Sequence, residues 1–269
     1  NMDLGLNGKT AFVAGASSGL GRAIAKELLQ EGCRVAICSR RQDRIHDAAL
    51  WLREVTGCAV DHILPLVCDV TKEQDIRHAI DKTIKAFGGL NLLVTNAGGP
   101  PTGLIDDLDA TTWRSALELN LISTINMCRI ALPALRVSAA NHASILMVSS
   151  LSAKQPITSL YLSNVSRAGV QGFAKGLSEE IGPEGITVNT ILPGYTKTDR
   201  LSHLSESLNA QTGTPIDEIE AGWAASSALK RIGTEDEFAA AATFLLSARA
   251  SFITGQAVVV DGGAVKSIL

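Results

Sequence analysis

Residues 10–39 read TAFVAGASSGLGRAIAKELLQEGCRVAICS, and this stretch decides the fold. It begins and ends with a short apolar run, at 10–14 and 34–39, of the kind found in strands buried in a parallel sheet. Between these runs, 20–31 carries its apolar residues on one helical face, and Gly32 supplies a helix stop. The stretch therefore predicts a strand, a crossover helix and a second, parallel strand.

The turn between the first strand and the helix contains three glycines. Gly15 permits a tight turn, Gly19 lets the backbone approach a pyrophosphate, and Gly21 allows close packing of the helix. The helix N-terminus then offers unpaired N–H groups and a partial positive charge to the phosphates. Because these glycines open a strand–helix–strand unit, they predict a dinucleotide-binding site.

The alternation of apolar runs with helical patterns continues to the end of the chain. We expect further strands at 63–68, 90–95, 144–149, 187–192 and 257–260, and helices at 43–55, 73–87, 113–135, 163–181 and 235–246. No linker or repeat interrupts the pattern, so we predict a single α/β domain over 1–269. Its architecture is a Rossmann-type, doubly wound parallel sheet of seven strands with helices on both faces.

One segment, 195–232, shows no clear period and is rich in Ser, Thr and Ala. It follows a predicted strand, and open α/β sheets bind ligands at the carboxyl ends of their strands. We therefore expect this segment to form a mobile lid over the substrate. An ordinary surface excursion is the alternative.

Composition and charge argue against several other classes of protein. The net charge of -3 leaves no basic excess for nucleic acid, which is not an expected partner. The five cysteines lack CxxC spacing and the five histidines lack ligand spacing, so we predict no disulfide and no metal site. No signal pattern is found, and no apolar stretch approaches the roughly 18 residues of a membrane span. We expect a cytoplasmic protein with no membrane partner.

The end of the second strand bears on the choice of cofactor. A carboxylate at this place binds the free adenosine ribose of NAD, but the sequence has Ser39 and Arg40 there. A hydroxyl and a guanidinium suit a 2′-phosphate. NADP(H) is therefore predicted in preference to NAD, the alternative being that Arg40 and Arg41 only solvate a loop.

Further motifs occur in the order and spacing typical of the short-chain dehydrogenase/reductase family, which the chain resembles from Gly8 onward. CDV at 68–70 is similar to the family's adenine-contacting segment, TNAG at 95–98 to its NNAG turn, and PGYTKT at 193–198 to its nicotinamide-side loop. The terminal ITGQAVVVDGG, 253–263, is also typical of the family. The resemblance implies an NADP-dependent oxidoreductase acting on a small-molecule substrate.

The family reduces carbonyls with a Ser, an Asn and a Tyr-x-x-x-Lys pair, and only part of this set carries over. Asn120 and Ser150 match the family Asn and Ser. When SRAGVQGFAKGLSEEIGPEGITVN at 166–189 is aligned on the family pattern, Arg167 stands at the lysine position and Ser163 at the tyrosine position. Tyr161 lies two residues too early, and a valine stands four positions after it.

The resemblance also implies a set of cofactor contacts around the glycine-rich turn, the adenine and the nicotinamide. They are Gly15, Ser17, Ser18, Gly19, Leu20, Gly21, Ser39, Arg40, Asp69, Val70, Asn96, Ala97, Gly98, Arg167, Pro193, Gly194, Thr196 and Thr198.

The replaced pair interrupts the usual route of the proton. An aliphatic hydroxyl is a much weaker acid than a phenol of pKa about 10, and arginine keeps its proton. Ser150 and Ser163 still donate hydrogen bonds to a developing oxyanion, and Arg167 still offers a positive charge and donors for ribose hydroxyls. The site is better equipped to hold negative charge than to deliver a proton.

Three hypotheses follow. The first is an NADPH-dependent reductase that adds hydride to a carbonyl or to a conjugated C=C. The second is a cofactor-binding sensor or scaffold with little catalysis. The third is a reductase in which Tyr161, Tyr195 or Lys154 serves as a substitute acid.

The sequence resembles a branch of the family with an S-x-x-x-R-type site, often labelled oxoacyl-carrier-protein reductase. More distantly, it resembles the reductases of bacilysin and aeruginosin assembly, which lack the Tyr–Lys pair and act on conjugated systems. By the same resemblance, the helices at 113–135 and 163–181 correspond to those that pair subunits, so a homotetramer or a dimer is expected.

Overall fold

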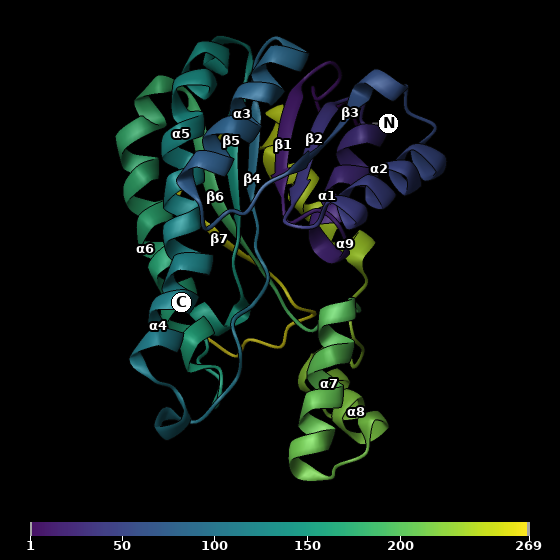
Figure 1. Ribbon diagram of the computed structural model, residues 1–269, viewed down its shortest axis with the longest axis vertical. Helices are drawn as coiled ribbons and strands as arrows, with labels where there is room; N and C mark the ends of the chain where they lie inside the picture. Colours follow the sequence, from purple (N-terminus) through teal and green to yellow (C-terminus); the bar gives the residue numbers. More distant parts are fainter. Residues whose placement is uncertain (1, 268–269) are drawn as a thin grey trace.

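A computed structural model describes residues 2–267, and the strands in this range form one seven-stranded sheet (Figure 1). The strand order is β3-β2-β1-β4-β5-β6-β7, and every neighbouring pair is parallel. This confirms the predicted doubly wound sheet. The strands are β1 (Thr10–Ala14), β2 (Arg34–Ser39), β3 (Ile63–Val67), β4 (Leu92–Thr95), β5 (Ala143–Val148), β6 (Ile186–Pro193) and β7 (Ala257–Val260).

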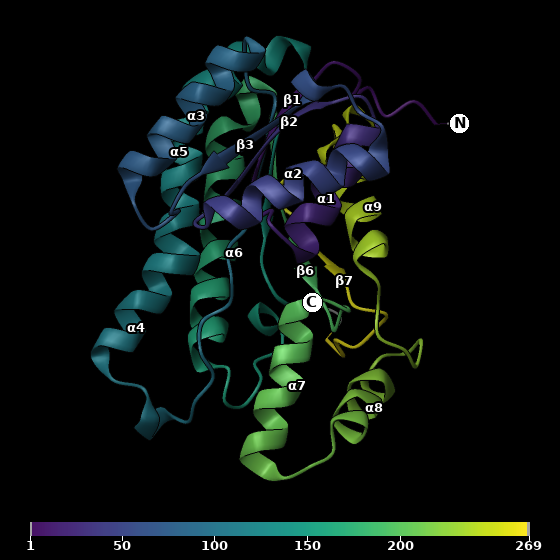
Figure 2. The ribbon, with the colours of Figure 1, turned by 45° about the vertical axis from the view of Figure 1, so that its right-hand side comes forward.

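Successive strand residues point to opposite sides of the sheet, so both of its faces carry apolar side chains. Helices cover both faces. Val13 of β1 packs in one apolar cluster with Ile24 and Phe238, whereas its neighbour Phe12 packs in another with Ile80. Figures 1 and 2 show the two layers of helices. One consists of α1 (Gly19–Gln30), α2 (Gln42–Thr56) and α9 (Glu235–Leu246), and the other of α3 (Glu73–Phe87), α5 (Ser123–Ser138) and α6 (Tyr161–Ile181).

None of the helices in residues 2–267 has the length and apolar character that crossing a membrane requires.

The chain reverses its direction of winding at β1, which pairs with β2 on one side and with β4 on the other. At such a switch point the loops after the two flanking strands diverge and leave a crevice at their carboxyl ends. The glycine-rich turn after β1 and the TNAG segment after β4 both lie at this edge of the sheet. The topology thus brings together segments about 80 residues apart in the chain.

The glycine-rich turn is packed as tightly as the sequence predicts. Gly15 has φ +60°, and a Cβ at Gly21 would overlap the carbonyl oxygen of Gly15. The first turn of α1 therefore approaches the end of β1 more closely than any side chain allows.

The helix predicted at 113–135 is in fact a longer and less regular run. It begins with α4 (Ala110–Leu117), capped by Asp109, whose carboxylate accepts a hydrogen bond of 2.7 Å from the backbone N–H of Thr112. A π-helical segment, Glu118–Ile122, then leads into α5. One π-helical turn hardly changes the 3.6-residue period of the apolar residues, so the sequence pattern does not reveal it. Such turns are frequent at functional sites.

The prediction of an irregular segment at 195–232 was wrong in its secondary structure. The segment forms α7 (Asp199–Thr212) and α8 (Ile216–Ser226), which extend beyond the carboxyl end of the sheet in Figure 2. In α8 none of the residues is buried, and in α7 only Ser205 is. A helix with so little buried surface needs no continuous apolar stripe, which is the signal that sequence reasoning relies on.

We expect the substitution Gly21→Ala to lower the free energy of unfolding by about 1–3 kcal/mol, because the new methyl group must push the α1 turn away from Gly15. Chemical denaturation followed by circular dichroism measures this change.

The matched control is Gly176→Ala in α6, where an added Cβ meets open space and φ is not left-handed. That variant should be unchanged or slightly more stable, by up to about 1 kcal/mol, since alanine is the better helix former. Equal stability of both variants would show that the turn is not tightly packed.

Candidate active site

A cavity of about 300 Å³ opens at the carboxyl ends of β1, β4, β5 and β6. Gly15 follows β1, Asn96 follows β4 and Ser149 follows β5, and all three line the cavity. Leu204 of α7 lines it as well. The cavity therefore lies between the edge of the sheet and the segment predicted to be a lid.

Many residues that the sequence analysis selected meet in this cavity. They are Gly15, Ser18, Gly19, Leu20, Asn96, Ala97, Gly98, Ser150, Ser163, Arg167, Pro193, Gly194, Thr196 and Thr198. Eight other selected residues do not line it: Ser17, Gly21, Ser39, Arg40, Asp69, Val70, Asn120 and Tyr161.

Four of these eight, Ser39, Arg40, Asp69 and Val70, belong to the ends of β2 and β3, where the backbone N–H of Cys68 donates to the carbonyl of Ser39 at 2.9 Å. Partial burial disfavours ionisation of Asp69, but hydrogen bonds from Thr71 and the positive charge of Arg40 together lower the pKa of its carboxyl. The Arg40 side chain itself forms no hydrogen bond or ion pair with residues 2–267, whereas Arg41 pairs with Asp43. Arg40 is thus available for an anionic ligand.

One wall of the cavity is formed by the glycine-rich turn after β1 and by the segment after β4 that contains Gly98. This wall leaves room for a bulky polar ligand. A Cβ at Gly98 would meet nothing within 4 Å, and one at Gly19 would meet no atom closer than 3.7 Å. Asn96 holds these segments together, because its Nδ2 donates to the carbonyl oxygen of Gly15 at 3.1 Å. Bare backbone next to open space at a helix N-terminus is the arrangement that receives a dinucleotide pyrophosphate.

Asn120 lies behind this wall rather than in it. Its Nδ2 donates to the carbonyl of Gly98 at 2.8 Å, and the Thr124 hydroxyl donates to the Asn120 carbonyl at 3.0 Å. The side chain is fully buried, and its Oδ1 has no hydrogen-bond partner among the described residues. Asn120 therefore positions the loop after β4 from the π-helical turn.

Arg167 projects from α6 into the floor of the cavity and is only 6% exposed. Its Nη1 donates to the Val148 carbonyl at 2.9 Å and its Nη2 to the Ala97 carbonyl at 3.4 Å, while its Nε has no partner in the described chain. Burial, together with the positive charge of Arg200, lowers the pKa of the guanidinium to about 10. Arg167 therefore remains charged at neutral pH without a carboxylate beside it.

Three serine hydroxyls gather next to this charge. Ser163 Oγ lies 3.1 Å from Ser152 Oγ, and Ser150 Oγ accepts a hydrogen bond of 3.2 Å from the Ser152 backbone N–H. Ser150 and Ser163 line the cavity, whereas Ser152 is buried behind them. Sequence reasoning missed Ser152, although it stands in the same SSLS run as Ser150.

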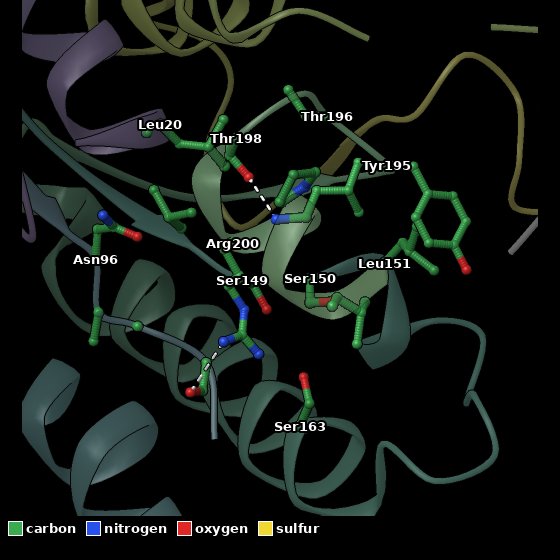
Figure 3. A pocket seen from close by; sticks show the side chains of 18 of the residues that line it. Leu20, Asn96, Ser149, Ser150, Leu151, Ser163, Tyr195, Thr196, Thr198 and Arg200 are labelled. Carbon is green, nitrogen blue, oxygen red and sulfur yellow. Dashed lines mark hydrogen bonds between the residues drawn. The ribbon is translucent and has the colours of Figure 1, made fainter. Parts of the chain in front are cut away.

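The other wall contains Tyr195, which the sequence offered as a substitute acid, and Arg200, which sequence reasoning missed. Tyr195 stacks on Trp223 of α8, with ring centroids 5.1 Å apart, and burial raises the pKa of its phenol. Arg200, two residues after the PGYTKT motif, reaches across to the carbonyls of Gly99 and Pro100. In Figure 3, Arg200 lies near Ser149, whereas the Tyr195 ring lies to the right, beyond Leu151.

Comparisons of the sequence place the chain among reductases and dehydrogenases. A family model described as enoyl-(acyl carrier protein) reductase matches residues 15–265. The 3-oxoacyl-(acyl-carrier-protein) reductase of Chlamydia muridarum is 32% identical over 256 residues, 95% of this chain and 96% of that protein. The L-fucose dehydrogenase of Bos taurus is 35% identical over 263 residues, 96% of this chain and 89% of that protein.

Solved structures agree with the sequence comparison. The L-sorbose reductase of Gluconobacter frateurii, in complex with NADPH and L-sorbose, has a TM-score of 0.92 at 30% identity, over 99% of this chain and 100% of that chain. YwfH, an NADPH-dependent reductase involved in bacilysin biosynthesis, has a TM-score of 0.89 at 27% identity, over 97% and 99% of the two chains. This chain belongs to the short-chain dehydrogenase/reductase family.

Proposed function

We propose that this protein is an NADPH-dependent reductase that transfers hydride to a small molecule, preferably to a conjugated C=C and otherwise to a carbonyl. The observation that carries the proposal is the set of groups on the cavity floor. The Ser150 and Ser163 hydroxyls line the same cavity as the buried, positively charged Arg167, and such groups stabilise a negative oxygen.

Residues on both sides of the cavity would hold the cofactor. The backbone of Gly15 to Leu20 suits the pyrophosphate, and Arg40, which has no ion pair in the described chain, suits the 2′-phosphate. The segments 96–98 and 193–198 frame the end of the cavity next to Arg167. NADPH bound there supplies the hydride. The two structural relatives described as NADPH complexes or NADPH-dependent enzymes support this assignment.

The chain's own groups then act on the substrate oxygen. Ser152 orients both cavity serines, because its hydroxyl meets Ser163 and its backbone N–H meets Ser150. When the Ser152 hydroxyl donates to Ser163, both cavity hydroxyls are free to donate to an oxygen in the cavity. Arg167, which is charged and shielded from water, strengthens the field at that oxygen.

Conjugate reduction matches this equipment better than carbonyl reduction does. When hydride adds to the β-carbon of an enone, negative charge accumulates on the distant oxygen, and the later protonation at carbon is available from water. Carbonyl reduction requires a proton on the oxygen itself, and a positioned acid contributes about 10²–10⁴ in rate. Ser163 and Arg167 do not supply one.

The substitute acids are less well placed for this role. Tyr161 and the exposed Lys154 do not line the cavity. Tyr195 does, but its raised pKa makes its phenol a weaker acid than usual. We therefore assign no general acid among these three side chains.

We further propose that the segment 195–232 is the substrate lid. Its two ends are joined, because the N–H of Gly233 donates to the Tyr195 carbonyl at 3.0 Å and the N–H of Lys197 to the Gly233 carbonyl at 2.9 Å. Helices α7 and α8 therefore form one flap with a narrow base, and Leu201 and Leu204 of α7 line the cavity.

We also propose a homo-oligomer that pairs through the α4–α5 run and α6. Ile122 is 37% exposed and Val165 is 50% exposed on these helices, which leaves apolar surface for a second copy. The cytoplasmic location stays a prediction.

With NADPH in excess, we expect faster turnover of enones than of the matching saturated ketones, tested with cyclohexenone against cyclohexanone and with β-acetylacrylate against levulinate. Ser150→Ala and Ser163→Ala should each lower kcat for the enone about 10- to 1000-fold, because each removes an oxyanion donor. Absorbance of NADPH and product analysis measure both effects.

Tyr161→Phe is the control and should keep the wild-type rate. Loss of activity in Tyr161→Phe alone would instead identify that phenol as a substitute acid. NADPH binding without turnover of any member of the panel would make the protein a cofactor-binding sensor and overturn the proposed reductase.

The choice of cofactor is tested separately with Arg40→Asp. The carboxylate should repel the 2′-phosphate and weaken NADPH binding at least about tenfold relative to NADH, because a charge-assisted hydrogen bond is lost. Arg44→Asp, which makes the same charge change in the first turn of α2, should leave the ratio of the two dissociation constants near its original value. An unchanged ratio in Arg40→Asp would remove Arg40 from the cofactor site. Fluorescence titration gives the constants.

A further inference from the structure

The cavity contains two arginine side chains, and neither has an ion-pair partner in residues 2–267. Elsewhere in the same residues, arginines do pair with carboxylates, as Arg136 does with Glu184 and Arg231 with Glu237. Charged groups removed from water are normally paired or hydrogen-bonded to compensating groups. Arg167 is buried and compensated only by two backbone carbonyls, whereas Arg200 is exposed and lines the same cavity without a counter-charge.

Arg200 is held only weakly by the protein. Its Nη1 donates to the Gly99 carbonyl at 3.4 Å and its Nη2 to the Pro100 carbonyl at 3.3 Å, both longer than the usual 2.9–3.0 Å of an N–H···O bond. A guanidinium has five N–H donors in a fork that matches a carboxylate. Most of the donor capacity of Arg200 is therefore free for a ligand in the cavity.

Arg167 and Arg200 also repel each other. The charge of Arg200 adds to burial in lowering the pKa of Arg167, and burial lowers the pKa of Arg200 as well. Both shifts express the cost of holding positive charge here without a counter-charge. An anion bound between the two guanidinium groups and the cavity opening reduces that cost.

The one carboxylate that lines the cavity does not serve as this counter-charge. Asp199 precedes Arg200 at the start of α7 but forms no ion pair with either arginine. Burial raises the pKa of Glu235 on α9, the charge of Arg22 opposes this shift, and the charge of Asp199 adds to it. The charge of Asp199 therefore acts on Glu235 of α9 rather than on Arg167.

Arg200 lies on the side of the cavity formed by the lid segment. The residue is the second of the lid helix α7, which begins at Asp199, and its side chain crosses to the loop at 99–100. In Figure 3 the Arg200 side chain lies between Thr198 and Ser163, next to Ser149. Ser150 and Ser163, which would meet a substrate oxygen, line the same cavity.

We propose that the substrate is a carboxylic acid, that is, an unsaturated or keto acid, and that Arg200 binds its carboxylate. This inference rests on the proposed reductase function and adds the substrate class. The carboxylate supplies the missing counter-charge to Arg200 and, at longer range, to Arg167. Arg200 lies on α7, so the same ion pair also draws the lid onto the occupied cavity.

The test compares β-acetylacrylate with its methyl ester, two enones that differ by one negative charge. With NADPH, the wild-type protein should prefer the acid to the ester at least about tenfold in kcat/KM. Arg200→Gln should abolish this preference through a higher KM for the acid, and Arg200→Lys should retain part of it. Lys82→Gln removes an exposed positive charge on α3, outside the cavity, and should keep the wild-type preference.

The dissociation constant of NADPH decides whether Arg200 serves the substrate or the cofactor. It should change by less than about twofold in Arg200→Gln, as expected for a residue without a contact to the cofactor. Equal losses of NADPH binding and of activity would assign Arg200 to the cofactor and overturn the proposal. An unchanged acid-to-ester ratio in Arg200→Gln would overturn it as well.

If neither probe is reduced, binding measures the same preference for the acid. In that case calorimetric titration of β-acetylacrylate and of its methyl ester into the NADPH complex replaces turnover. Tighter binding of the acid that is lost in Arg200→Gln supports the carboxylate site even without reduction. Equal binding of acid and ester contradicts it, whereas reduction of both probes without preference contradicts the carboxylate site and leaves the reductase standing.

Discussion

The carbonyl oxygen of Gly15 is the point on which the rest of the site depends. It accepts a hydrogen bond from Asn96 Nδ2 at 3.1 Å, and the Cα of Gly21 packs against it so closely that no side chain fits. The first contact joins the ends of β1 and β4, and the second sets the N-terminus of α1 at the same place. Because β1 is the strand at which the winding reverses, this contact determines the shape of the crevice. The bare backbone of Gly98 then faces open space, and that of Gly19 lines the same cavity.

The chemistry of the cavity follows from which groups are held rigidly and which are not. Arg167 is held by the carbonyls of Val148 and Ala97, and two of the serines are linked through Ser152, so the floor is preorganised before any ligand arrives. Preorganised donors stabilise developing charge without the cost of reorientation. Arg200, in contrast, lies on a lid helix with little buried surface and makes only long bonds. The rigid part of the cavity suits the reacting oxygen, and the loosely held part suits recognition of the remainder of the substrate.

The strands and most helices were predictable because both signals they carry are local. A parallel strand buried on two faces is a short apolar run, and the helices that cover it show one apolar stripe. The prediction for 113–135 missed the π-helical turn around Asn120, whose amide bonds to Gly98 in a distant loop. The prediction for 195–232 missed α7 and α8, since helices that bury almost nothing carry almost no stripe. In the first case, the contact that fixes the local structure is made with a distant part of the chain. In the second case, the buried contacts that would leave an apolar pattern are few.

By itself, the sequence determined the parallel α/β architecture, the glycine-rich turn and the family, because these depend on residue order and spacing along one stretch of chain. It also predicts that Ser163 and Arg167 stand at the positions where the family has tyrosine and lysine, which stays a prediction. Only the tertiary structure decided which of the selected residues share a cavity, leaving Tyr161 outside it and bringing Arg200 within it. It also decided that Arg167 and Arg200 lie close enough to influence each other without a carboxylate between them. Charge compensation is a property of side chains that meet in space, and residues 33 positions apart have no local pattern that reveals it.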